Sequence, residues 1–220
     1  MTKHLENQIN HLKKEILYVG ALVEEALRNA LKAFSDKDYA LANRVIENDE
    51  IIDQKEVEVE EDCLKILALY QPVAIDLRYI ISVLKINNDL ERIADLAVNI
   101  ASRTKFLTDV AEIKIPDSLF TIAEKVEQML NMSLDSLVNS DAEIARSVLM
   151  ADDEVDDLHA AMYGIAKNNL EKDPSKIDQW FNVIAISRYL ERAADHTTNI
   201  AEDVIYLVDG EITRHESGKI

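Results

Sequence analysis

Two matching sets of oxygen-bearing side chains recur 100 residues apart in the sequence. Each set has the pattern Glu-x-x-x-Asp-x-x-x-Asn, and the members are Glu91, Asp95 and Asn99 in the first half and Glu191, Asp195 and Asn199 in the second. Residues four apart lie on the same face of an α-helix. The spacing therefore predicts, in each half, a row of two carboxylates and one amide along a helix.

A second acidic pair at the same four-residue spacing precedes each row. Asp49 and Asp53 form this pair in the first half, and Asp152 and Asp156 form it 103 residues later. If the two helices of each half are neighbours, four carboxylates face one another, and such a group is hard to keep ionised without a counter-ion. Oxygen ligands without imidazole or thiolate favour hard cations such as Mg²⁺, Ca²⁺ or Mn²⁺, or oxygen-seeking iron.

Two differences between the halves predict that their sites are not equivalent. Asp203 extends the second row by one step, whereas Arg103 stands at the corresponding position of the first. Asp89 likewise corresponds to Tyr189. The full set of candidate metal ligands is Asp49, Asp53, Glu91, Asp95, Asn99, Asp152, Asp156, Glu191, Asp195, Asn199 and Asp203.

The alternative is an acidic helix face that stays solvated and binds nothing. The chain has 42 Asp and Glu residues among 220, so single acidic pairs at helical spacing are expected by chance. Repetition of the whole pattern is not expected by chance, but a duplicated helix without metal would also produce it. The residues by themselves leave both interpretations open.

The composition indicates a helical chain with a negative surface. Gly and Pro number only 4 and 3, and 48% of the residues are hydrophobic, which favours long helices around a core. The net charge of −18 repels nucleic acid backbones and anionic lipid, so we expect no nucleic-acid partner. The single cysteine excludes a disulfide framework, and no apolar run is long enough for a membrane span. We therefore expect a cytoplasmic protein that meets membranes only through partners.

Apolar residues at three- and four-residue spacing predict helices in the same order in each half. The expected ranges are 3–34, 37–47, 49–70 and 73–107, followed by 117–138, 141–150, 152–171 and 175–208. Each half thus has a long, a short, a medium and a long helix. The simplest architecture is all-α, with two similar helical bundles over residues 1–110 and 111–220 related by an internal pseudo-twofold axis.

The sequence contains no pattern typical of an activated nucleophile or a Gly-rich phosphate loop. Ferritin-like di-iron bundles use Glu-x-x-His, and only Asp156-Asp157-Leu158-His159 comes near that pattern. We expect His196 to pack against or support its neighbours rather than to bind metal. The favoured interpretation is a docking protein without catalysis, and the alternative is a metal-storage or metal-dependent hydrolytic protein.

Three longer stretches resemble the PhoU family of phosphate-uptake regulators. They are LYQPVAIDLR at residues 69–78, SVLKINNDLERIAD at 82–95 and LERAADHTTNIAEDVIY at 190–206. The resemblance covers almost the whole chain, in the order found in the family and with both halves present. One departure is Ala94 and Ala194, where the family often has Gly.

The resemblance implies a fold of two tandem three-helix bundles and a regulatory function. Proteins of this family are cytoplasmic negative regulators, often homodimers, that link the ATPase subunit of the phosphate ABC transporter to a sensor histidine kinase. They repress the transcription of phosphate-starvation genes when phosphate is plentiful. Some members hold multinuclear iron or other metal clusters on paired Glu/Asp-x-x-x-Asp motifs. By position, those motifs are Asp49, Asp53, Glu91 and Asp95 in one half and Asp152, Asp156, Glu191 and Asp195 in the other.

Overall fold

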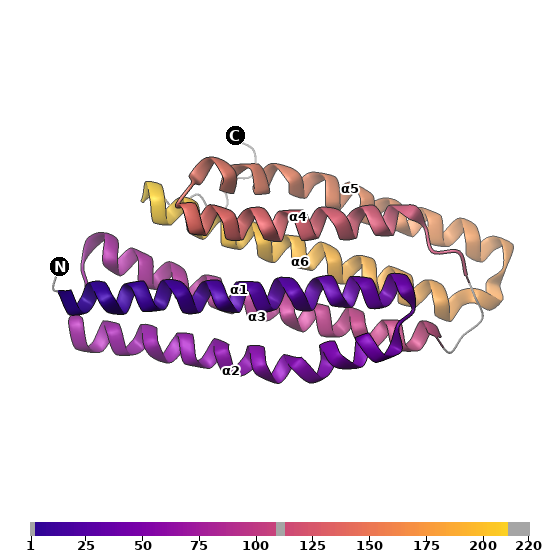
Figure 1. Cartoon of the computed structure of the whole chain (residues 1–220). Helices are drawn as coiled ribbons and strands as arrows, with labels where there is room; N and C mark the ends of the chain where they lie inside the picture. The colour runs from indigo at the N-terminus through magenta and orange to yellow at the C-terminus, as the bar shows by residue number, and fades with distance from the viewer. Residues whose placement is uncertain (1–2, 109–112, 211–220) are drawn as a thin grey trace.

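The computed structural model describes residues 3–108 and 113–210, without the side chains of residues 106–108. The described part is built from long helices, and Figure 1 shows their arrangement. They are α1 (Lys3–Asp36), α2 (Tyr39–Tyr70), α3 (Ala74–Thr108), α4 (Asp117–Asn139), α5 (Ala142–Lys172), the short 3₁₀ helix η1 (Pro174–Lys176) and α6 (Ile177–Asp209). The predicted all-α class is confirmed, and the expected bundle boundary at residues 110 and 111 lies outside the described residues.

The expected division of each half into short and medium helices is wrong. The expected helices 37–47 and 49–70 are parts of one helix, α2, which begins at Tyr39, and the expected helices 141–150 and 152–171 are likewise parts of α5, which begins at Ala142. Asn48 and Asp49 at the first expected junction and Asp152 at the second resemble N-caps, but no Gly or Pro stands there to end the helix. The buried stripe also continues across the junction, from Val45 to Ile52 in α2 and from Val148 to Val155 in α5. Each half therefore has three helices.

The helix ends follow from capping residues that the sequence supplies. The side chain of Asp38 accepts a hydrogen bond from the backbone N–H of Leu41 at 2.9 Å and so caps α2. Asp141 caps α5 in the same way through the N–H groups of Glu143 and Ile144. Gly210 ends α6 with φ at 77°, a left-handed conformation that glycine adopts without strain.

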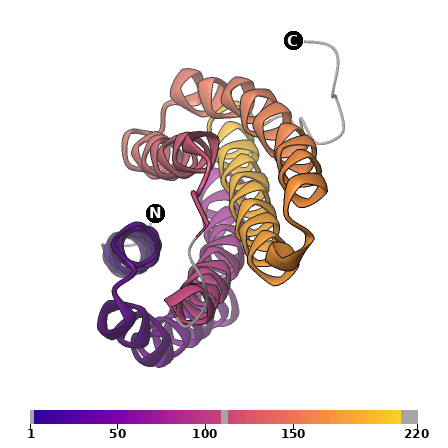
Figure 2. The same cartoon turned by 90° about the vertical axis from the view of Figure 1, so that its right-hand side faces the viewer.

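The two three-helix bundles meet along α3 and α6. Figures 1 and 2 show these two helices side by side in the middle, with α1 and α2 flanking α3, and α4 and α5 flanking α6. This arrangement matches the expected pair of tandem bundles. None of the described helices combines the length and hydropathy that crossing a bilayer requires.

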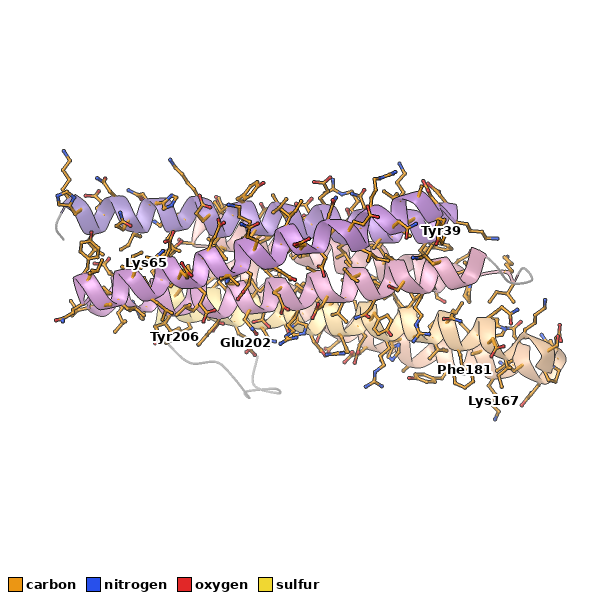
Figure 3. The ribbon with its side chains drawn as sticks, turned by 90° about the horizontal axis from the view of Figure 1, so that it is seen from below. Tyr39, Lys65, Lys167, Phe181, Glu202 and Tyr206 are labelled. Atoms are coloured by element: carbon orange, nitrogen blue, oxygen red, sulfur yellow. The ribbon has the colours of Figure 1, made fainter. Side chains whose placement is uncertain are left out.

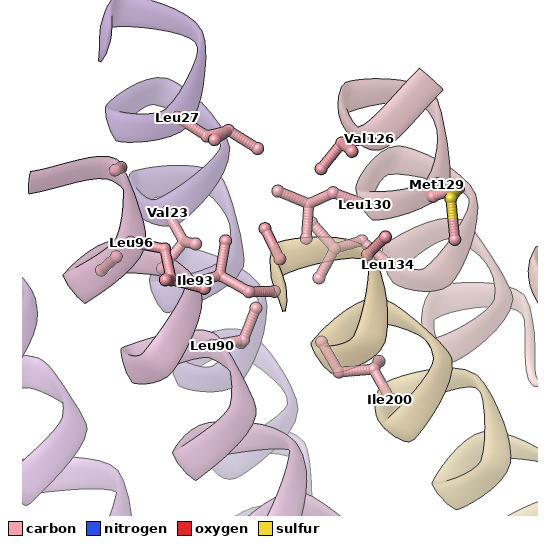
Figure 4. Packing of buried hydrophobic residues seen from close by; sticks show 14 of the residues in the cluster. Val23, Leu27, Leu90, Ile93, Leu96, Val126, Met129, Leu130, Leu134 and Ile200 are labelled. Atoms are coloured by element: carbon pink, nitrogen blue, oxygen red, sulfur yellow. The ribbon is translucent and has the colours of Figure 1, made fainter. Parts of the chain in front are cut away.

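One continuous hydrophobic core joins the two bundles. Figure 4 shows Leu27 of α1, Ile93 of α3 and Leu130 of α4 in one cluster of buried side chains. The two outer helices α1 and α4 also touch, at Gly20. A Cβ atom at that position would lie 2.7 Å from Cδ2 of Leu134, so the missing side chain allows α4 to approach α1.

Candidate functional site

Four predicted carboxylates of the first half come within electrostatic range of one another, and we name Asp49, Asp53, Glu91 and Asp95 acidic group 1. Asp49 and Asp53 are carried by α2, and Glu91 and Asp95 by α3. Partial burial, followed by the charges of Asp53, Asp95 and Glu91, raises the pKa of Asp49 to about 6. Burial, and then the charge of Asp95, raises the pKa of Glu91, although the neighbouring Arg92 acts in the opposite direction.

The second half repeats this arrangement between α5 and α6, and we name Asp152, Asp156, Glu191 and Asp195 acidic group 2. Burial, and then repulsion from neighbouring carboxylates including Asp156 and Asp195, raises the pKa of Asp152 to about 7. Burial is also the main cause of the raised pKa of Glu191 and of Asp195. Each half therefore brings its four predicted carboxylates to one helix pair, and their mutual repulsion disfavours the fully ionised form.

Two oxygen atoms in these groups suit a hard cation. Glu91 Oε2 and Asp152 Oδ1 are buried and accept no hydrogen bond within the described parts of the chain, although Nε of Arg92 lies 3.4 Å from Glu91 Oε2. A buried carboxylate oxygen without a donor is costly, and a bound cation would satisfy it. As the side chains stand in residues 3–108 and 113–210, no three carboxylate, imidazole or thiol groups converge closely enough to hold an ion. The donor chemistry thus fits a metal, and binding would require these side chains to change rotamer.

Two of the three remaining candidate ligands contact residues of α3 instead. Asn199 donates from Nδ2 to Oδ1 of Asp89 at 3.1 Å, and Asp203 places Oδ1 at 3.1 Å from Nζ of Lys85. Asn99 is exposed to solvent. Asn199 and Asp203 therefore serve the contact between α3 and α6.

One polar contact between α3 and α6, which local sequence patterns do not predict, occurs in only one of the two described halves of this interface. Nδ1 of His196 lies 2.8 Å from Oδ1 of Asp89, so His196 supports a neighbour, as expected. The positions corresponding to Asp89 and His196 hold Tyr189 and Leu96, which cannot form such a contact. The mismatch between Asp89 and Tyr189 was visible in the sequence, but only the packing of α3 on α6 gives it a partner.

A second polar contact that the sequence analysis missed borders each acidic group. Nδ1 of His159 on α5 lies 2.7 Å from Oγ of Ser187 on α6. At the corresponding positions of the first half, Asn87 donates from Nδ2 to the backbone carbonyl of Glu56 at 2.9 Å. Burial, and then the charge of Arg188, lowers the pKa of His159, which favours its neutral form. These contacts fix the relative positions of the helices that carry the acids.

Comparison with known proteins gives one consistent result along both halves. The family model described as the PhoU domain matches residues 16–104 and 119–204. A relative from Clostridium acetobutylicum is 34% identical over 94% of this chain and 95% of its own length. A relative from Pseudomonas aeruginosa is 38% identical over 98% of this chain and 91% of its own length. Both relatives are named phosphate-specific transport system accessory protein PhoU homolog.

Two solved structures share the whole architecture. PhoU from Pseudomonas aeruginosa superimposes with a TM-score of 0.91 at 37% identity, covering 94% of this chain and 99% of that one. The phosphate transport system regulatory protein PhoU from Streptococcus pneumoniae superimposes with a TM-score of 0.85 at 30% identity, covering 94% and 98%. Since both halves match and the similarity spans nearly the whole length, the chain belongs to the PhoU family.

Proposed function

We propose that this chain is an accessory regulator of phosphate transport that restrains uptake when phosphate is plentiful. The observation that carries the proposal is similarity over nearly the full length to relatives named as accessory proteins of the phosphate-specific transport system. Both bundles are included in that similarity, so the regulatory body as a whole is retained rather than a single shared domain.

In the finer form of the proposal, the chain acts as a cytoplasmic adaptor, and its homodimer bridges the transporter ATPase and a sensor histidine kinase. It thereby keeps transcription of the phosphate-starvation genes repressed. The long exposed helix faces support docking, because they offer large rigid surfaces for partner proteins. The proposal assigns no catalytic step to the chain.

Deletion of the gene tests this function. We expect phosphate-starvation genes to be expressed, and phosphate to be taken up, even in phosphate-rich medium, and we expect the intact chain supplied in trans to restore control. Reporter activity and uptake of radiolabelled phosphate measure the two effects. Unchanged expression and uptake in the deletion strain would contradict the proposal.

We also propose that acidic groups 1 and 2 bind hard metal ions. The two buried oxygens that accept no hydrogen bond, on Glu91 and Asp152, and the raised pKa values favour this over a solvated acidic face. When bound, a multivalent cation would supply the missing positive charge between the helices. Glu91 and Asp95 would hold it from α3 and Asp49 and Asp53 from α2, with the corresponding four carboxylates in the second half.

Metal content and thermal unfolding together test the second proposal. We expect natively purified protein to contain metal by elemental analysis, and metal to raise the Tm of chelator-treated protein. Glu91→Gln combined with Asp152→Asn should abolish both effects, whereas the same change at exposed carboxylates, Glu143→Gln with Asp153→Asn, should abolish neither. Equal metal content in the two double variants would contradict the assignment.

A further inference from the structure

A groove with a volume of about 520 Å³ lies between the two bundles, at the end of the molecule where α6 finishes. Tyr206 marks that end of α6 in Figure 3, and Phe181 marks the other. The apolar walls of the groove include Ile9 and Leu17 of α1, Ile75 of α3, Leu137 and Val138 of α4, and Val208 of α6. Ile75 and Val138 are 60% and 55% exposed, so apolar surface at the mouth faces solvent.

The internal duplication does not by itself produce this groove. At the 103-residue offset, Leu17 corresponds to Phe120 and Leu137 corresponds to Phe34. Those two phenylalanine rings contact each other with centroids 5.9 Å apart, and so fill the equivalent place at the opposite end. In addition, α1 has 34 residues and α4 only 23, so the first turns of α1 form a wall that α4 does not reproduce. The end that holds Leu17 and Leu137 thus lacks the aromatic pair that fills the space at the opposite end.

The groove is long rather than round. Its lining residues on α1 run from Glu6 to Leu17, which is three turns of helix and about 16 Å at 1.5 Å per residue. An amphipathic helix of about three turns can place apolar residues at i, i+3 or i+4, and i+7 along such a groove. The exposed Ile75 and Val138 would contact the outer edges of that apolar face.

The charges of the groove and of the whole chain favour a basic segment over other molecules that could fill the groove. The lining of the groove includes Glu6 and Asp76 as well as Lys13, whose ammonium lies 5.3 Å from the centroid of the Tyr79 ring. The whole chain has a net charge of −18. At this groove, an acidic helix of a second copy and an anionic membrane would both be repelled, whereas a segment rich in Lys or Arg would be attracted.

We propose that this groove binds an amphipathic α-helix of a partner protein, with one apolar face and Lys or Arg residues beside it. The inference rests on the proposed function, since a regulator of transport must contact another protein. It adds the chemistry of the partner segment and the place where that segment docks.

A fluorescent model peptide tests the binding. The probe is a three-turn helix with Leu along one face and Lys elsewhere, and its control has the same Leu positions with Glu in place of Lys. Fluorescence anisotropy with the full chain should show binding at least about tenfold tighter for the Lys peptide. Equal binding of the two peptides, or no binding of the Lys peptide at about 1 mM, would overturn the inference.

Two matched variants separate the groove from general attraction to an acidic protein. Val138→Asp should weaken binding of the Lys peptide at least about tenfold, although the added negative charge would strengthen non-specific attraction. Met150→Asp adds the same charge at a residue of α5 that is 63% exposed and lies outside the groove, and should change binding less than about twofold. Ile75→Asp is the second groove variant, should Val138→Asp lose its helical circular dichroism. Equal effects inside and outside the groove would overturn the assignment.

The same variants in cells distinguish this inference from the proposed function. In a strain that lacks the gene, Met150→Asp should restore phosphate control and Val138→Asp should not, with equal amounts of both proteins present. Control restored by both variants would overturn the groove as the partner site, and the proposed function would stand. A wild-type chain that restores nothing would instead refute the proposed function.

Discussion

Asp89 and His196 join the two bundles by a side-chain contact of 2.8 Å across the α3–α6 interface. The same carboxylate oxygen accepts a hydrogen bond from Asn199 at 3.1 Å. Both partners in the contact are largely buried, with side-chain exposures of 13% and 18%. Because the pseudo-twofold counterpart pairs Tyr189 with Leu96, the other half of the interface has no equivalent of this carboxylate–imidazole contact.

Removal of the Asp89 carboxylate should therefore destabilise the whole fold. Asp89→Ala leaves His196 and Asn199 without their acceptor, and the free energy of unfolding should fall by about 1–3 kcal/mol. Urea denaturation followed by circular dichroism measures the change. Asp135→Ala, at an exposed carboxylate on α4, is the control and should leave the urea midpoint unchanged. Equal midpoints for the two variants would contradict a role in the interface.

The ion pair between Lys85 and Asp203 provides a second test of the same interface. The Asp203 side chain is only 2% exposed, and Lys85→Met would leave its carboxylate without the ammonium 3.1 Å away. We expect a loss of about 3 kcal/mol in unfolding free energy, measured by urea denaturation. Arg103, at the position corresponding to Asp203, is exposed and donates to the neutral amide of Asn182, so Arg103→Met should cost much less. Equal losses would show that the two halves are energetically alike.

In metal-free protein, acidic group 2 should make stability depend on pH. The pKa of Asp152 is raised from 3.8 to about 7, so the native state holds a proton that the unfolded state releases between these values. The stability that the folded chain gains from protonation of Asp152 is fully present below about pH 4 and is lost as the pH rises to about 7. Asp152→Asn should thus stabilise the chain at about pH 8, by about 1 kcal/mol after allowance for solvent screening of a partly exposed group.

Urea denaturation in the presence of a chelator, at about pH 4 and about pH 8, measures this effect. The difference between Asp152→Asn and the wild type should be small at the lower pH and appear at the higher one. Asp153→Asn, at the exposed neighbouring carboxylate, is the matched control. A stabilisation by Asp152→Asn that is the same at both pH values would contradict the assigned cause.

Two glycines within helices should respond in opposite ways to alanine. A Cβ atom added at Gly164 on α5 would meet no neighbouring helix or side chain within 4 Å, so Gly164→Ala should stabilise by about 0.5–1 kcal/mol through helix propensity. At Gly20 the new Cβ would lie 2.7 Å from Cδ2 of Leu134, and the Leu134 side chain must move. Gly20→Ala should therefore gain nothing, or lose stability, in thermal denaturation. A gain at Gly20 equal to that at Gly164 would show that α1 and α4 are not closely packed.

Much of this protein could be predicted from local sequence patterns. Helices follow from apolar residues at three- and four-residue spacing, and the duplication follows from patterns that recur at offsets of 100 and 103 residues. The rows that contain Glu91 and Glu191 were predicted on the same grounds. The error at the expected junctions inside α2 and α5 has a simple cause, since Asn and Asp at a helix start and inside a helix look alike in sequence.

Only the tertiary structure decided which side chains meet across helices. Local spacing places residues on a helix face but says nothing of the partner helix, its register or its distance. For that reason the contacts of Asp89 with His196 and of Lys85 with Asp203 required the packing of α3 on α6. The groove has the same origin, because it depends on how far α1 extends past α4 and on whether leucine or phenylalanine fills the space between them.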